Sequence, residues 1–209
     1  MLATVLGSYL FAASADAGEI ENISKVNSSV RVDAERQVGD VSSVNGGIDL
    51  ARGALARDVH TVNGGIDLSD NVEIDSAETV NGGIRVGTDV KVNGSLETVN
   101  GGIRTDGGTV IEDRVRTVNG KIRLHETHVG RDVQTSNGDI ELRNNTVVEG
   151  DLIVKGRQSW FGRLFNFNHR PPTITVDGSS AIHGDIHLHR EAELNIDENA
   201  EVGDIIRHY

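Results

Sequence analysis

The pentapeptide Val-Asn-Gly-Gly-Ile, or a close variant of it, returns along this chain at a nearly fixed interval. Successive units, aligned on the asparagine, lie 18, 18, 18, 19, 19 and 18 residues apart. Glycine follows every aligned asparagine except the first, and an aliphatic residue stands three positions after each one. The aligned residues are Asn27, Asn45, Asn63, Asn81, Asn100, Asn119 and Asn137. A constant period of this length predicts a repeat architecture, in which each unit packs only on its neighbours.

An Asn-Gly pair between apolar residues is also typical of a two-residue β-hairpin turn. Successive strands of a hairpin meander run in opposite directions, however, which gives no reason for one identical turn per unit. A solenoid explains the repetition, because identical residues stack about 4.8 Å apart when each unit forms one coil. Stacked asparagine amides can hydrogen-bond along the axis, since each has two donors and an acceptor. We therefore assign the seven asparagines to a structural ladder and expect the following glycine to provide an unusual corner φ and a close backbone approach.

Within the coils, apolar residues recur at every sixth position, as at Val26, Val32, Val38 and Val44. Three inward positions in 18 residues predict three short strands per coil and a triangular cross-section. An aromatic content of only 3% fits a narrow interior filled by Val, Ile and Leu. The sequence thus predicts an all-β fold, a single-stranded parallel β-helix (β-solenoid) with 18–19 residues per coil. About nine coils would form a rod roughly 40–45 Å long.

Four segments divide the chain. Residues 1–17 are apolar, lack Lys and Arg, and end in Ala-Asp-Ala, which resembles a signal peptide with its cleavage site. The alternative is a buried amino-terminal helix or strand. Solenoid coils are expected over 18–153 and 173–209, with an aromatic and basic insertion at 154–172. The expected location is therefore outside the cytoplasm, in the periplasm or at the cell envelope or surface.

The Val-Asn-Gly-x-Ile coils, and the Gly-Asp-Ile and Gly-Asp-Val half-coils near 180–186 and 200–205, resemble two bacterial groups. One is an exported adhesin-like β-solenoid family of unknown function, and the other is the bactofilins, polymer-forming cytoskeletal proteins. The resemblance covers about 25–153 and 173–205. It implies a right-handed helix, which the period alone does not, because a period of six also suits the left-handed helix of hexapeptide acyltransferases. The apparent export signal favours the exported family over the bactofilins.

The insertion reads VKGRQSWFGRLFNFNHRPP and contains no acidic residue. A short helix there would gather Trp160, Phe161, Leu164 and Phe165 on one face. Two interpretations remain open: the insertion covers part of the solenoid, or it is an exposed patch that contacts a membrane surface or an anionic envelope polysaccharide. The candidate binding residues are Arg157, Trp160, Phe161, Arg163, Leu164, Phe165, Phe167 and Arg170.

Other candidate sites have simpler interpretations. His183, Asp185, His187 and His189 would share one face of a single strand, but same-face neighbours lie about 7 Å apart, so only two could share an ion. We therefore predict a solvated polar face, with no metal and no cofactor. The residue after each repeated aliphatic position is charged, which predicts a solvated charge ladder. Its members are Arg31, Asp49, Asp67, Arg85, Arg104, Arg123 and Glu141.

The net charge of −12 argues against a nucleic-acid partner, because phosphate binding needs clustered Lys and Arg. No catalytic residue is assigned, since His125 and His128 lie in a regular coil without a recognisable substrate cleft. We expect a non-enzymatic structural or adhesin-like envelope protein, with open ends that self-associate by end-to-end stacking. The alternative is a surface-binding module acting through residues 157–170. A carbohydrate-active enzyme or an acyltransferase is the least favoured class.

Overall fold

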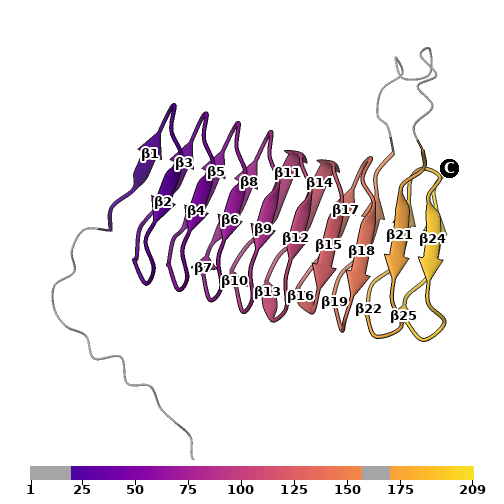
Figure 1. The fold of residues 1–209 in the computed structure, drawn as a ribbon. Coiled ribbons are helices and arrows are strands. Elements are labelled where there is room, and N and C mark those ends of the chain that lie inside the picture. Colours follow the sequence, from indigo (N-terminus) through magenta and orange to yellow (C-terminus); the bar gives the residue numbers. More distant parts are fainter. Residues whose placement is uncertain (1–19, 157–169) are drawn as a thin grey trace, which may run out of the picture.

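The computed structural model describes residues 20–156 and 170–209, and these form an elongated stack of coils (Figure 1). The predicted signal peptide lies outside the described residues, as does most of the predicted insertion, 157–169. All regular secondary structure in the described ranges is β-strand. No helix that could span a membrane is found there.

The strands form three parallel sheets, one on each side of the solenoid. The first sheet contains β1 (Ile23–Lys25), β3 (Val41–Ser43), β5 (Asp58–Thr61), β8 (Ser76–Thr79), β11 (Leu96–Asn100), β14 (Val115–Asn119), β17 (Val133–Thr135), β20 (Leu152–Val154), β23 (Ile186–Leu188) and β26 (Ile205–Arg207). The second contains β2 (Val30–Val32), β4 (Ile48–Leu50), β6 (Ile66–Leu68), β9 (Ile84–Val86), β12 (Ile103–Thr105), β15 (Ile122–His125), β18 (Ile140–Arg143), β21 (Thr173–Val176) and β24 (Glu193–Ile196). The third contains β7 (Glu73–Ile74), β10 (Lys91–Val92), β13 (Thr109–Ile111), β16 (Thr127–Val129), β19 (Val147–Val148), β22 (Ala181–Ile182) and β25 (Glu201–Val202).

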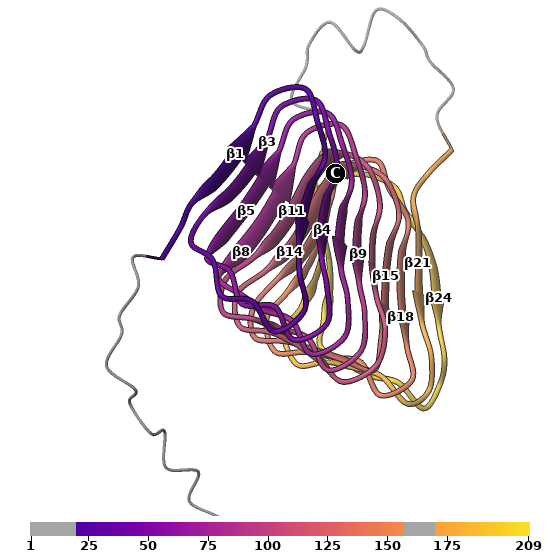
Figure 2. The ribbon, with the colours of Figure 1, turned by 60° about the vertical axis from the view of Figure 1, so that its left-hand side comes forward.

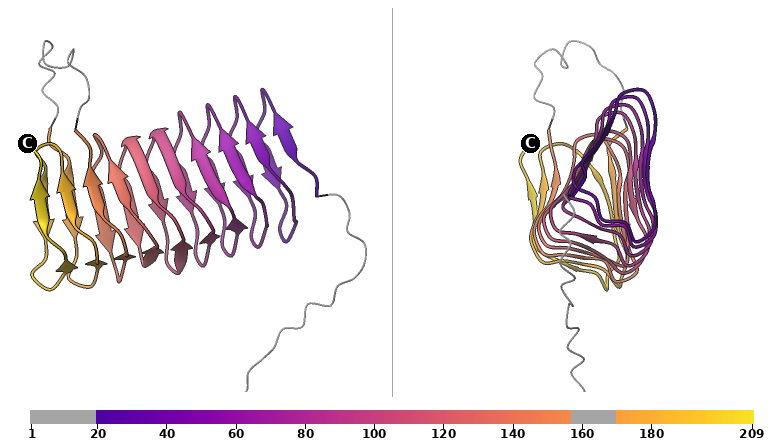
Figure 3. Two further views of the ribbon diagram at one scale, coloured as in Figure 1. Left: turned by 180° about the vertical axis from the view of Figure 1, so that it is seen from behind. Right: turned by 90° about the vertical axis from the view of Figure 1, so that its left-hand side faces the viewer.

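From β5 onward, each coil visits the three sheets in turn and then rises to the next coil (Figure 2). In the two earlier coils the third side has only isolated bridges, at Gln37 and Leu55. The strand register stacks identical residues of successive coils: Ile66 pairs with Ile48 on one side and with Ile84 on the other. Views from behind and along the axis show the coils superposed around one interior (Figure 3). The predicted all-β solenoid of about nine coils is therefore confirmed, and its three sheets give the predicted three-sided section.

The interior is a continuous column of Val, Ile and Leu, as in the fully buried Leu96, Ile111 and Ile122. Aromatic side chains are absent from this buried set within the described residues. One part of the predicted six-residue period is wrong, because Val26 and Val44 are 61% and 41% exposed. Strand alternation explains the error: the inward position in the first sheet lies two residues before the asparagine, not one.

Three corners join the sheets, and the one with left-handed backbone is not the asparagine corner. Positive φ recurs between the second and third sheets, at Glu35 (58°), Gly53 (68°), Asn71 (58°) and Asp89 (55°). The glycines that follow the ladder asparagines do not have positive φ. The expectation that they provide an unusual φ is therefore wrong, and close approach alone explains them.

Candidate functional site

The asparagine corner joins the first and second sheets and carries an unbroken row of side-chain hydrogen bonds. Each Asn Nδ2 donates to Oδ1 of the Asn one coil earlier, at 2.8–3.0 Å. The row begins at Asn27 and ends at Asn137. The side chains are solvent-exposed, so their hydrogen bonds organise the surface of the corner and not the core.

The glycine directly after the asparagine, which is present in every unit except the first, allows this close stacking. A Cβ built on Gly64, Gly82 or Gly101 would overlap the carbonyl oxygen of the corresponding glycine one coil earlier. The second glycine is less restricted, since a Cβ on Gly65 would lie 3.3 Å from the oxygen of Gly83. The two glycines of one motif therefore have different roles.

A second ladder runs inside the corner and was missed by the sequence analysis. A buried Thr lies two residues before the Asn in most coils, and its hydroxyl donates to a glycine carbonyl one coil earlier at 2.8–2.9 Å. The pairs are Thr61–Gly46, Thr79–Gly64, Thr98–Gly82 and Thr117–Gly101. The repeated Thr-Val-Asn tripeptide was the available signal, because a hydroxyl at a fixed inward position needs a fixed partner.

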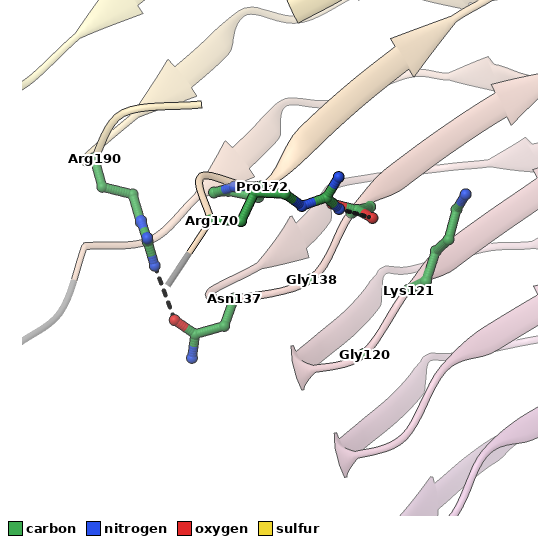
Figure 4. A pocket seen from close by; sticks show the side chains of 8 residues that line it. Gly120, Lys121, Asn137, Gly138, Arg170, Pro172 and Arg190 are labelled. Carbon is green, nitrogen blue, oxygen red and sulfur yellow. Dashed lines mark hydrogen bonds and ion pairs between the residues drawn. The ribbon is translucent and has the colours of Figure 1, made fainter. Parts of the chain in front are cut away.

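The ladder stops where the repeat is interrupted. Between β20 and β21 the chain passes through 157–169, outside the described residues, so Asn137 is the last member of the row in the part of the chain that the structure describes. Arg190, which follows β23, donates from Nη1 to Oδ1 of Asn137 at 2.9 Å (Figure 4). The same nitrogen lies 3.3 Å from the backbone oxygen of Ser136. A guanidinium thus takes the place of the next amide in the row.

Arg170 is the one predicted binding residue that the structure describes. Its Nη2 donates to both carboxylate oxygens of Asp139, at 2.7 and 2.9 Å, and the backbone N–H of Thr173 donates to the same carboxylate at 2.9 Å. These contacts fix the chain where it returns to the solenoid. The other seven predicted binding residues, from Arg157 to Phe167, lie outside the described residues.

A cleft of about 340 Å³ opens beside these contacts, and we call it the corner cleft. Its charged residues are Lys121, Asp139, Arg170 and Arg190 (Figure 4). Two of its cations are already paired, Arg170 with Asp139 and Lys121 with Glu141. The hydrogen bond from Lys121 is the main cause that holds the pKa of Glu141 below its usual value, although partial burial opposes it.

The predicted same-face histidine set does not form on one strand. His183 follows β22, Asp185 lies in the next corner, and only His187 belongs to β23, with His189 just beyond it. The chain turns between β22 and β23, so residues 183–189 do not form one continuous strand and need not lie on one face. No group of three His, Asp or Glu side chains that could hold a metal ion occurs in the described part of the chain.

His183 and His189 instead make separate contacts with different partners. His183 Nδ1 lies 2.8 Å from Glu149 Oε2, and this hydrogen bond raises the pKa of His183 and lowers that of Glu149. His189 stacks on His208 with ring centroids 4.3 Å apart. Burial, followed by the positive charge of His208, Lys155 and His187, lowers the pKa of His189.

The charge ladder lies on the outer face of the second sheet. Arg31 and Arg85 contact Asp49 and Asp67 at 3.7 and 3.2 Å, so opposite charges meet in adjacent coils. Arg104 forms an ion pair with Asp106 of its own coil, at 3.2 Å. Most of these side chains are exposed, so each pair contributes little to stability.

The two histidines considered for catalysis lie apart. His125 Nε2 is 2.6 Å from the amide nitrogen of Asn144, and His128 Nε2 is 3.7 Å from Glu149 Oε1. His125 belongs to β15 of the second sheet, whereas His128 belongs to β16 of the third sheet. Neither histidine lines the corner cleft.

No protein-family model, curated protein or solved structure matches the chain. The fold and its ladders therefore define the class, a β-solenoid of about nine turns, from this chain's own residues.

Proposed function

We propose that this protein is a non-enzymatic structural or adhesin-like β-solenoid of the bacterial cell envelope. The observation that supports this proposal is that the repeated polar residues bind the next coil. The Asn amides and Thr hydroxyls make contacts between coils, and the first corner glycine permits them. Such repetition maintains a stiff, extended shape, which suits a spacer or a display surface.

The envelope location rests on the resemblance of residues 1–17 to a signal peptide. The test is expression of the full chain in a Gram-negative host, followed by cell fractionation and mass spectrometry of the amino terminus. We expect a shortened chain outside the cytoplasm. A variant without residues 1–17 is the control and should stay in the cytoplasm. An uncleaved cytoplasmic full-length chain would contradict the proposal.

The second candidate is a surface-binding module for a membrane or an anionic envelope polysaccharide. It is favoured by the cations that gather at the base of the insertion, Lys121, Lys155, Arg170 and Arg190, although the chain as a whole carries a net charge of −12. The test is to replace Trp160 and Phe165 by Ser. Loss of envelope or liposome association with an unchanged melting temperature supports binding. A large fall in the melting temperature supports an insertion that covers the fold.

A further inference from the structure

A second cleft, on the outer face of the first sheet, lies on the other side of the interrupted corner. It has a volume of about 570 Å³, within the range of small-ligand sites, and we call it the sheet cleft. Arg116 of β14, Gln134 of β17 and Ser136, which follows β17, form one wall. Lys155 and His189, which follow β20 and β23, form the other. The cleft consists entirely of described residues.

The cations of the sheet cleft are less neutralised than those of the corner cleft. Lys155 makes no ion pair with any carboxylate in the ranges 20–156 and 170–209. Arg116 makes one contact, with Glu97 at 3.5 Å, and Glu97 also contacts Arg114. Asp151 contacts His187 at 3.5 Å, and no ion pair joins His189 to a carboxylate within the described ranges. The sheet cleft therefore keeps a local positive charge in an acidic protein.

The surroundings of His189 are positively charged as well. Burial, and then the positive charge of His208, Lys155 and His187, lowers the pKa of His189. An anion in the cleft would reverse this influence, because an opposite charge within about 4–6 Å favours the protonated imidazole.

The rest of the lining is neutral. Gln134 offers an amide, Ser136 a hydroxyl and Val118 an apolar surface. Amide and hydroxyl groups suit the hydroxyls of a sugar, and an aliphatic side chain suits the C–H face of its ring. Cations beside these groups suit a carboxylate on the same sugar.

We propose that the sheet cleft binds a carboxylate-bearing sugar unit of an anionic polysaccharide. Lys155 and Arg116 hold the carboxylate, and Gln134 and Ser136 hydrogen-bond the hydroxyls. This proposal deepens the second candidate function and moves recognition from the segment 157–169 to the wall of the solenoid.

The test is calorimetry on the intact protein with a trimer of galacturonic acid, and with the neutral galactose trimer as the comparison ligand. We expect the acidic trimer to bind at least tenfold more tightly, and Lys155→Gln to weaken its binding about tenfold, since a charge-assisted hydrogen bond is lost. Lys91→Gln is the matched control, because it removes the same charge from the third sheet and should leave binding unchanged. NMR titration should show that the trimer raises the pKa of His189.

Three results would overturn the proposal: equal affinity for the neutral trimer, equal losses in the Lys155 and Lys91 variants, or binding of anionic lipid vesicles without binding of the trimer. The double variant Trp160→Ser/Phe165→Ser separates the two proposals. If this variant loses binding while Lys155→Gln keeps it, the surface-binding function stands and the sheet cleft is not its site. If Lys155→Gln alone loses binding, recognition lies in the cleft.

Discussion

At the scale of single residues, the two glycines after each ladder asparagine differ in how much space they have. Gly64→Ala would place a methyl group against the backbone oxygen of Gly46, which cannot move without shifting a coil. We expect a loss of about 3 kcal/mol or more in the free energy of unfolding. Gly65→Ala, with 3.3 Å to the nearest oxygen, is the matched control and should cost much less. Equal losses in urea denaturation would show that close stacking is not the reason for the first glycine.

The asparagine row gives a second prediction at this scale. Asn81→Ala removes two hydrogen bonds of 2.9 Å, one to each neighbouring coil. Because the row is solvent-exposed, we expect the free energy of unfolding to fall by only about 1–2 kcal/mol. Asn93→Ala is the comparison, since its amide makes only longer contacts, at 3.3 and 3.4 Å, to Glu73 and Asp75. A loss for Asn93→Ala as large as that for Asn81→Ala would contradict a stabilising row.

At the scale of the strand, the buried threonines of the first sheet hydrogen-bond to glycine carbonyls of the asparagine corner one coil earlier. Thr98→Val keeps the shape of the side chain but leaves the carbonyl of Gly82 without its hydroxyl donor. We expect a loss of about 1–3 kcal/mol in the free energy of unfolding, measured by heat or urea, because a partly buried acceptor left without a partner is costly. Thr175→Val, on the half-buried outer face of β21, is the control and should have little effect. If Thr98→Val were as stable as the wild type, the hydrogen bond from Thr98 to Gly82 would not contribute to stability.

The outer face of the second sheet gives a pH-dependent prediction. The folded chain holds the pKa of Glu141 below its usual value of 4.5, mainly through the hydrogen bond from Lys121. The ionised carboxylate therefore stabilises the fold at pH values above the unfolded-state pKa, and this contribution is lost as the pH falls through the lower folded-state pKa. Lys121→Met should raise the pKa of Glu141 in a carboxyl NMR titration. Lys91→Met, whose partner is Glu73, should not change it.

The elements also show what a sequence can and cannot reveal. Spacing alone predicts the coils, because stacked residues such as Ile48 and Ile66 must be alike to keep one register. The six-residue period places Val44 inward, but Val44 is 41% exposed and the buried residue is Ser43, since the period ignores the two-residue alternation within each strand. Arg190 at Asn137 could not be predicted, because the two residues are 53 positions apart and meet only across the interruption.

At the scale of the whole molecule, the two ends of the rod carry cations in the core-facing register of the first sheet. Lys25 pairs with the buried Ser43 at one end, and Arg207 pairs with the buried Leu188 at the other. Head-to-tail stacking of two copies would bring Lys25 and Arg207 together, and like charges in one column repel. We propose that end-to-end association is therefore weak in dilute salt and increases as salt screens this repulsion.

Negative-stain microscopy at two salt concentrations measures this effect. We expect single rods near 0.05 M salt and longer stacks near 1 M, where the screening length falls to about 3 Å. The variant Lys25→Thr/Arg207→Thr should stack at both concentrations. Arg85→Thr/Arg104→Thr, which removes the same charge from the side of the rod at β9 and β12, should behave like the wild type. Single rods in every sample would contradict stacking.

The asparagine row also has an electrical direction. Every amide points the same way, with its nitrogen toward the earlier coil and its oxygen toward the later one. Aligned amide dipoles add, as they do along an α-helix, and leave a partial negative charge at the oxygen end. That end is Asn137, where the guanidinium of Arg190 is bound. The interruption of the repeat thus coincides with the negative pole of the row, and Arg190 neutralises this pole as a lysine or arginine does at the carboxyl end of a helix.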